Sequence, residues 1–181
     1  MRQKKNILTV AAAAAMVVLS TSAAATSAGA AVPAEHAATA AAAKPAASKA
    51  DVICYQAHVQ NDGWQGWKCN NEVAGTTGRS LRLEALRIRA YGAGRVCASA
   101  HVQDIGWMDR KCAGSGGLVQ VGTTGRSLRM EALRLSVGSG RVSGSAHVQN
   151  IGWMAYETGR SIEIGTTGRS LRMEAVKLRL R

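Results

Sequence analysis

A segment of eleven residues occurs three times along this chain, as GTTGRSLRLEA at residues 75–85 and as GTTGRSLRMEA at residues 122–132 and 165–175. A second segment precedes each copy, as AHVQNDGW at 57–64, AHVQDIGW at 100–107 and AHVQNIGW at 146–153. The equivalent tryptophans are 43 and 46 residues apart, and the equivalent glutamates are 47 and 43 residues apart. Two linked motifs in a fixed order and at a nearly constant period indicate three copies of one structural unit.

The three units span about residues 52–90, 95–137 and 141–181. Their lengths differ only between the tryptophan and the Gly-Thr-Thr-Gly motif, where the second unit carries extra residues that include Gly114–Gly117. Length variation at a glycine-rich point is typical of a surface loop.

The eleven-residue segment of each unit and the residues directly after it favour a β-strand. Leu81, Leu83 and Ala85 alternate with polar residues, and Leu86 and Ile88 continue the alternation in the opposite phase. Period two predicts a strand, although Leu, Arg, Glu and Ala favour helices. The phase changes after the alanine in each unit, which predicts a β-bulge or a bend at that point.

The other parts of the unit are also typical of β structure. The segment 57–64 is predicted to form a strand that closes at a glycine, and Gly-Thr-Thr-Gly is predicted to form a turn. Three units of short strands predict an all-β domain that closes with pseudo-threefold symmetry and so protects its strand edges. The unit length favours a β-prism, with a β-trefoil as the alternative.

The first fifty residues are predicted to lie outside the folded domain. Basic residues near Met1 precede an apolar run at 7–19, and small residues with A-x-A patterns follow, which is typical of a secretory signal peptide at 1–30. Residues 31–50 are alanine-rich and lack large apolar side chains, which predicts a flexible linker. No later segment is long and apolar enough to span a bilayer, so we expect an extracellular chain, free or held at the cell surface.

The four cysteines follow the repeat. Cys54 and Cys97 occupy equivalent positions before the histidine, and Cys69 and Cys112 occupy equivalent positions after the tryptophan. The third unit has Ser143 and Thr158 at these two places, so both cysteines are missing together. The repeat therefore favours the disulfides Cys54–Cys69 and Cys97–Cys112, with cross-unit pairing and free thiols as alternatives. Each bond would close a 15-residue loop, worth about 3 kcal/mol in the chain-entropy model. The cysteine spacing does not favour a zinc site.

The tryptophans are the first candidates for ligand contact. They are Trp64, Trp107 and Trp153 in the repeat, and Trp67, whose place is taken by Arg110 and Tyr156 in the other units. Tryptophan stacks on sugar rings and dominates many recognition surfaces. However, the domain lacks phenylalanine, so we expect the three repeat tryptophans to anchor the core and Trp67 to be exposed.

Polar residues supply further candidates and their structural alternatives. Loop arginines beside glycines bind carboxylate, sulfate or phosphate, and glutamines add hydrogen bonds. These candidates are Arg79, Arg126, Arg169, Gln60, Gln103 and Gln149. Alternatively, the loop arginines pair with the repeat glutamates or face solvent. The histidines at 58, 101 and 147 are expected to make structural hydrogen bonds within their own units, with a threefold zinc site as the minor alternative.

The repeat glutamates are interpreted as structural residues. Each of Glu84, Glu131 and Glu174 follows an arginine by two positions, which predicts an ion pair. The sequence contains no nucleophile–base arrangement and no metal motif. We therefore expect a protein that is not an enzyme and requires no cofactor or metal.

The two linked motifs resemble the ChW repeat, the clostridial hydrophobic repeat with a tryptophan, over about residues 52–181. The resemblance implies an extracellular protein of a Gram-positive bacterium. Proteins of this family are proposed to bind macromolecules, glycans or proteins. The cysteines are an addition to the usual unit.

The charge and composition of the chain limit the classes of binding partner that we expect. Residues 51–181 contain 18 Lys and Arg and 10 Asp and Glu. A basic extracellular domain attracts anionic partners such as wall polymers. The sequence lacks a nucleic-acid-binding motif, so specific nucleic-acid binding is not expected. The favoured hypothesis is a monomeric, multivalent module for an extracellular glycan or wall polymer, and the alternative is a module that binds a surface or secreted protein.

Overall fold

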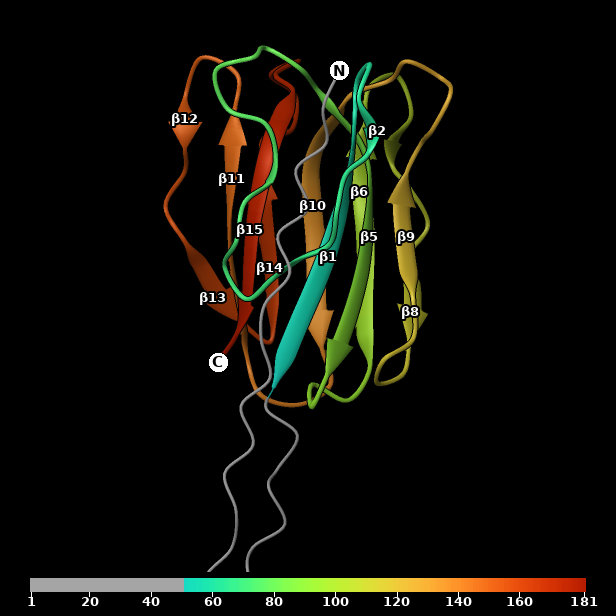
Figure 1. Cartoon of the computed structure of the whole chain (residues 1–181), viewed down its shortest axis with the longest axis vertical. Coiled ribbons are helices and arrows are strands. Elements are labelled where there is room, and N and C mark those ends of the chain that lie inside the picture. The colour runs from blue at the N-terminus through green and yellow to red at the C-terminus, as the bar shows by residue number, and fades with distance from the viewer. Residues whose placement is uncertain (1–50) are drawn as a thin grey trace, which may run out of the picture. The chain divides into compact units, whose positions relative to one another are not determined.

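The structure is a computed structural model that describes residues 51–181, and the predicted signal peptide and linker lie outside the described residues. The described part is all-β, as predicted, and contains five strands in each unit (Figure 1). Unit 1 contains β1 (Val52–Val59), β2 (Gly63–Trp64), β3 (Lys68–Cys69), β4 (Ala74–Gly75) and β5 (Leu83–Tyr91). Unit 2 contains β6 (Val96–Val102), β7 (Gly106–Trp107), β8 (Lys111–Ala113), β9 (Val119–Gly122) and β10 (Met130–Val137). Unit 3 contains β11 (Val142–Val148), β12 (Gly152–Trp153), β13 (Glu157–Gly159), β14 (Ser161–Gly165) and β15 (Met173–Leu180).

The strands form three five-stranded antiparallel sheets, and every sheet combines two units. Four strands come from one unit and the fifth comes from another, so that β9 of unit 2 pairs with β5 and β14 of unit 3 pairs with β10. The third exchange closes the ring, because β4 of unit 1 pairs with β15 near the end of the chain. Three separate sheets around a shared core make the domain prism-like.

The first glycine of each Gly-Thr-Thr-Gly motif makes this exchange possible. A Cβ atom on Gly75 would lie 2.3 Å from the backbone oxygen of Glu174. A Cβ atom on Gly122 or Gly165 would lie 2.4 Å from the backbone oxygen of Glu84 or Glu131, respectively. The φ angle of Gly75 is +105°, which side chains disfavour. The next amide then bonds to the same oxygen, from Thr76 to Glu174 at 2.9 Å. Glycine is therefore needed here both for its φ angle and for the close approach of two units.

The predicted bulge is confirmed in all three units, and it lies at the glutamate. His58 pairs with Ala85 while Val59 pairs with Leu83, so that Glu84 is the extra residue. The same shift occurs around Glu131 and Glu174. Because the bulge interrupts the alternation, four consecutive residues, Leu83–Leu86, are buried.

The prediction of a strand over 57–64 is wrong in its second half. β1 ends at Val59, and after a tight turn β2 pairs back onto it, with Trp64 opposite His58. Asn61 and Gly63 have φ angles of 66° and 73°. Asn and Gly tolerate this region, so the chain reverses where the sequence pattern suggested continuation.

The core is aliphatic except for Tyr55, which is fully buried. Its hydroxyl accepts a hydrogen bond from the Leu178 amide at 3.0 Å and donates to the Glu72 carbonyl, so it connects units 1 and 3. Burial raises the pKa of Tyr55 to about 12. The equivalent positions hold Ala98 and Gly144. One large side chain therefore fills a space that three equal side chains would overfill.

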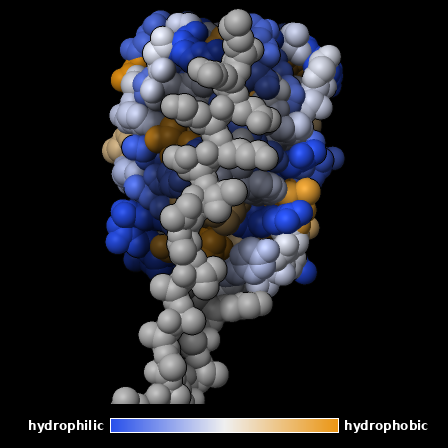
Figure 2. Space-filling view, viewed as in Figure 1, coloured by the Kyte–Doolittle hydropathy of each residue, from blue (hydrophilic) through white to orange (hydrophobic). Residues whose placement is uncertain are grey.

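The prediction that the repeat tryptophans anchor the core is wrong. Trp64 and Trp107 are half-buried and Trp153 is 37% exposed, whereas the buried cluster is built from residues such as Leu83, Met130 and Met173. The tryptophans lie on the short strands β2, β7 and β12, outside the long strands that supply the core. Figure 2 shows mainly hydrophilic residues on the coloured part of this face, with a few hydrophobic residues among them.

Candidate functional site

Each unit places a tryptophan cluster on its surface, defined here as the repeat tryptophan, the histidine opposite it and one cation. The histidine rings of His58, His101 and His147 meet the tryptophans edge-on, with centroids 5.1, 5.4 and 5.4 Å apart. A cation lies over each indole ring: Arg87 at 4.0 Å, Arg134 at 3.9 Å and Lys177 at 4.2 Å. These cation–π and edge contacts hold each indole in one orientation.

A buried ion-pair cluster supports each tryptophan cluster. Glu84 is 6% exposed, accepts a hydrogen bond from Arg82 Nε at 3.0 Å and lies 3.1 Å from His58 Nδ1. The contact of His58 Nδ1 with the carboxylate does not have hydrogen-bond geometry, and it is an ion pair only when the histidine is protonated. Units 2 and 3 repeat this arrangement with His101–Glu131–Arg129 and His147–Glu174–Arg172.

These contacts decide two of the predictions. The ion pair between the glutamate and the arginine two positions earlier is confirmed in every unit. The partner of each histidine lies in its own unit, as expected, although the contact is not a straight hydrogen bond. Because an unpaired buried carboxylate is costly, the bulge, the arginine and the histidine depend on one another.

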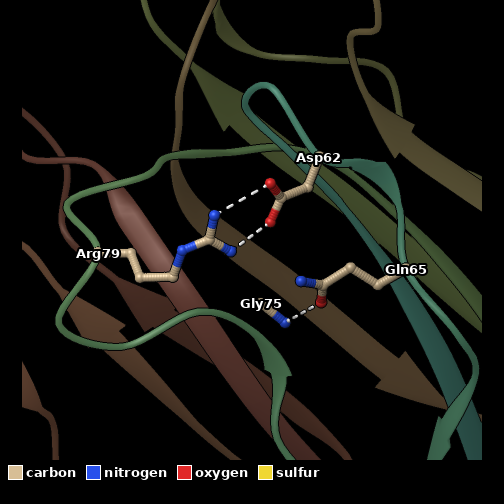
Figure 3. Close-up of polar contacts among 4 residues, drawn as sticks. All are labelled: Asp62, Gln65, Gly75 and Arg79. Carbon is tan, nitrogen blue, oxygen red and sulfur yellow. Dashed lines mark hydrogen bonds and ion pairs between the residues drawn. The ribbon is translucent and has the colours of Figure 1, made fainter.

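The loop arginines and the glutamines do not gather with the tryptophans through any side-chain hydrogen bond among residues 51–181. Arg79 forms two bonds to Asp62, at 2.6 and 3.2 Å (Figure 3). Arg126 and Arg169 are exposed, and Ile105 and Ile151 replace Asp62 in their units. The three candidate glutamines are partly exposed, and their backbone amides donate to the backbone carbonyls of arginines. These pairs are Gln60 with Arg82, Gln103 with Arg129 and Gln149 with Arg172.

Unit 1 has further contacts of its own beside this loop. The Gln65 side chain accepts a hydrogen bond from the Gly75 amide at 2.8 Å (Figure 3). Methionine replaces Gln65 in the other units, as Met108 and Met154. The loop surface of unit 1 is therefore polar and internally paired, whereas units 2 and 3 present an isoleucine that is 40% exposed in each.

The residue at the position of Trp67 is different in each of the three units. Trp67 is exposed, as predicted, and Arg89 lies over its ring at 5.2 Å. In unit 3, Arg179 lies over the Tyr156 ring at 5.2 Å. Unit 2 replaces this aromatic–arginine stack with Arg110 and Ser136, joined by a hydrogen bond of 2.7 Å.

A groove opens in unit 2 where the stack is missing. It has a volume of about 470 Å³ and extends from Trp107 and Arg134 to Arg110, over Ser99 and Ser136. Ser161, on β14 of unit 3, forms part of its wall. The corresponding pocket of unit 1 is about 190 Å³ and is lined by Trp67, Arg89, Tyr91 and Cys54.

Sequence analysis missed the groove because one wall comes from another unit. The available signal was the substitution of Trp67 by Arg110, which an alignment of the three units displays. The effect of this substitution depends on Ser136, which lies on β10 and becomes a neighbour of Arg110 only in the folded protein.

The fold and its surface clusters define a pseudo-threefold, all-β repeat protein with one tryptophan cluster in each unit. A family model described as Clostridial hydrophobic W matches residues 58–92, 101–138 and 147–181. The chain belongs to this family, and the predicted three repeats are confirmed. No curated protein and no solved structure matches the chain.

Proposed function

We propose that this chain is a secreted, non-enzymatic binding module that recognises extracellular polysaccharides, such as cell-wall polymers, through its tryptophan clusters. The observation that carries the proposal is the position of Trp64, Trp107 and Trp153. Each lies partly exposed on the surface, in an orientation held by a histidine and a cation. Aromatic rings held in this way offer large contact areas at low entropic cost.

The disulfides support the extracellular part of the proposal. Cys54–Cys69 and Cys97–Cys112 are both formed, as predicted, and no free cysteine remains in the described part of the chain. Disulfides persist in oxidising compartments. Within residues 51–181, the structure contains no helix that is long and apolar enough to cross a membrane.

Three related surfaces favour multivalent binding. One tryptophan cluster per sheet allows a long polymer to contact more than one unit, so that weak individual sites give a higher overall affinity. The basic surface adds attraction for anionic polymers, and this contribution weakens as salt rises.

A protein partner is the second candidate. Ile105 and Leu118 of unit 2 are 40% and 45% exposed, and Ile151 of unit 3 is 40% exposed. Apolar side chains of this kind contribute to protein interfaces. None of these three residues lines the groove beside Trp107, so polysaccharide binding remains the first proposal.

Binding of the purified secreted chain to a glycan and wall-polymer array, at low and physiological salt, tests the proposal. We expect a ligand that is retained at physiological salt. Simultaneous Trp64→Ala, Trp107→Ala and Trp153→Ala substitutions should abolish this binding without unfolding the protein, and Trp67→Ala is the matched aromatic control. Binding that disappears with salt would indicate charge attraction alone, and a silent array would favour the protein partner.

A further inference from the structure

The groove distinguishes unit 2 from the other two units. The inference drawn from it rests on the proposed function and names a more specific site for that function. All three units have the same strands at this place, so they serve as internal references for one another. In units 1 and 3 an aromatic–arginine pair occupies this place, Trp67 with Arg89 and Tyr156 with Arg179, and the pocket of unit 1 is narrowed to about 190 Å³. Unit 2 leaves it open.

We propose that the groove beside Trp107 is a binding site for a sugar that carries a carboxylate. Its volume of about 470 Å³ lies within the range of small-molecule sites, about 300–1,000 Å³. Its lining combines the Trp107 indole ring, the guanidinium groups of Arg110 and Arg134, and serine hydroxyl groups. A pyranose ring with a charged substituent presents the complementary groups.

The serines supply polar groups for sugar hydroxyls. Ser99 donates to the Met108 carbonyl, and Ser136 accepts from Arg110, so both hydroxyls have fixed orientations. Gln56 occupies the place of Ser99 in unit 1, where its amide spans to the Gln65 carbonyl. Unit 3 has the same serine as unit 2, Ser145, bonded to the Met154 carbonyl, so Ser99 supplies a polar floor, and the feature that only unit 2 has is Arg110 with Ser136. Ser161 adds an exposed hydroxyl from unit 3.

The two arginines of the groove have different roles. Arg134 lies over Trp107 and pairs with Glu163 at 2.8 Å, so its charge is compensated. Within residues 51–181, no carboxylate lies within salt-bridge distance of Arg110. Its hydrogen bond to Ser136 uses one of the five guanidinium donors. The remaining donors can form a bidentate pair with a ligand carboxylate.

Arg110 is therefore the contact for the anion, and the Trp107 ring is the contact for the sugar face. Because Arg110 is exposed, solvent weakens its ion pair, so the carboxylate should contribute about a tenfold gain in affinity. In the other units the arginine at this place, Arg89 or Arg179, lies over an aromatic ring, so one face of its guanidinium group is already in contact.

Two oligosaccharides with the same backbone test the inference on the full secreted chain. One is a tetrasaccharide of alternating N-acetylglucosamine and N-acetylmuramic acid, and the other is the N-acetylglucosamine tetrasaccharide, which lacks the lactyl carboxylates. Calorimetry should show about tenfold tighter binding of the carboxylated compound. Arg110→Gln should remove that preference, and Arg95→Gln, which removes an exposed charge outside the groove, should leave it unchanged.

A second variant keeps the inference falsifiable if Arg110→Gln disturbs the groove. Arg110→Trp with Ser136→Arg rebuilds the stack of unit 1 and should remove the preference for the carboxylated compound while the melting temperature is retained. Equal affinities in the unaltered protein, or a preference that survives Arg110→Gln, would overturn the inference. Tighter binding of a glycerol phosphate oligomer would also overturn it.

Failure of the inference differs from failure of the proposed function. If the neutral compound binds equally well and Trp107→Ala removes its binding, the polysaccharide module stands and the carboxylate site falls. If neither compound binds, the carboxylate site falls, and the module falls only if the wall-polymer array is also silent.

Discussion

Units 1 and 2 differ from unit 3 at a bridge between two facing strands. Cys54 faces Cys69 and Cys97 faces Cys112, and both pairs are disulfide-bonded. In unit 3, Ser143 faces Thr158 in the same register, and their hydroxyls share a hydrogen bond of 2.9 Å. The strands therefore adopt the same pairing with and without the covalent bond, which shows that the bridge is not needed for the shape of the unit.

The bridges should differ in what they contribute to stability. A disulfide that closes a loop of 15 residues contributes about 3 kcal/mol in the chain-entropy model. A hydrogen bond between two hydroxyls contributes about 1 kcal/mol. Unit 3 depends more than the others on noncovalent contacts, including the pairing of β15 with β4 that closes the ring.

Converting both disulfides into the bridge of unit 3 should have the largest effect. Cys54→Ser with Cys69→Thr, together with Cys97→Ser and Cys112→Thr, should lower the free energy of unfolding by about 4 kcal/mol. Urea unfolding measures the loss, and each pair alone should account for about half of it. Loss of the β-sheet circular dichroism signal in native buffer would show that the bridges are required for the fold.

Removing one glutamate tests a feature that is common to all units. Glu174→Ala leaves His147 and Arg172 without their acid, and we expect a loss of about 2–3 kcal/mol because the carboxylate is almost fully buried. Glu84→Ala should cost the same in a disulfide-bonded unit. Glu163→Ala is the control, since its exposed pair with Arg134 should contribute less than about 1 kcal/mol. A much smaller loss for Glu84→Ala would mean that the disulfide compensates for the cluster.

A third disulfide should make unit 3 resemble the others. Ser143→Cys with Thr158→Cys places two thiols on facing residues and should raise the free energy of unfolding by about 2 kcal/mol once oxidised. Unfolding with and without a reductant isolates the contribution, and Ser143→Cys alone is the control. No gain after verified bond formation would mean that the serine–threonine bridge already restrains this loop as well as a disulfide.

Tyr55 provides the smallest expected effect and concerns the asymmetric core. Tyr55→Phe removes the bonds to Leu178 and Glu72 and should cost about 1.5 kcal/mol at neutral pH. Burial raises the pKa of this group from 10.0 to about 12, so the folded state disfavours the phenolate. Its contribution should hold below pH 10 and decline as pH rises from 10 to about 12. Comparing the alkaline unfolding of the two proteins measures this, and identical profiles would contradict the assignment.

Several features of this protein follow from its sequence because they depend on local or repeated patterns. The three copies align without ambiguity, so the cysteines pair where the repeat places them. The alternation in 81–88 identified a strand, and its change of phase identified a bulge. Both signals arise from neighbouring side chains that face opposite sides of one strand, and no distant contact is needed to produce them.

Other features required the tertiary structure because they depend on which units meet. Nothing local indicates that β4 of unit 1 pairs with β15, since the pairing joins the two ends of the domain. The tryptophans are at the surface because Tyr55 and aliphatic residues already fill the core. The groove of unit 2 is lined by residues on β6, β7 and β10 of its own unit and by Ser161 on β14 of unit 3, at a place where Ser136 replaces the arginine of the other units. Sequence patterns describe the faces of single strands, but only packing determines which faces meet and what space remains between them.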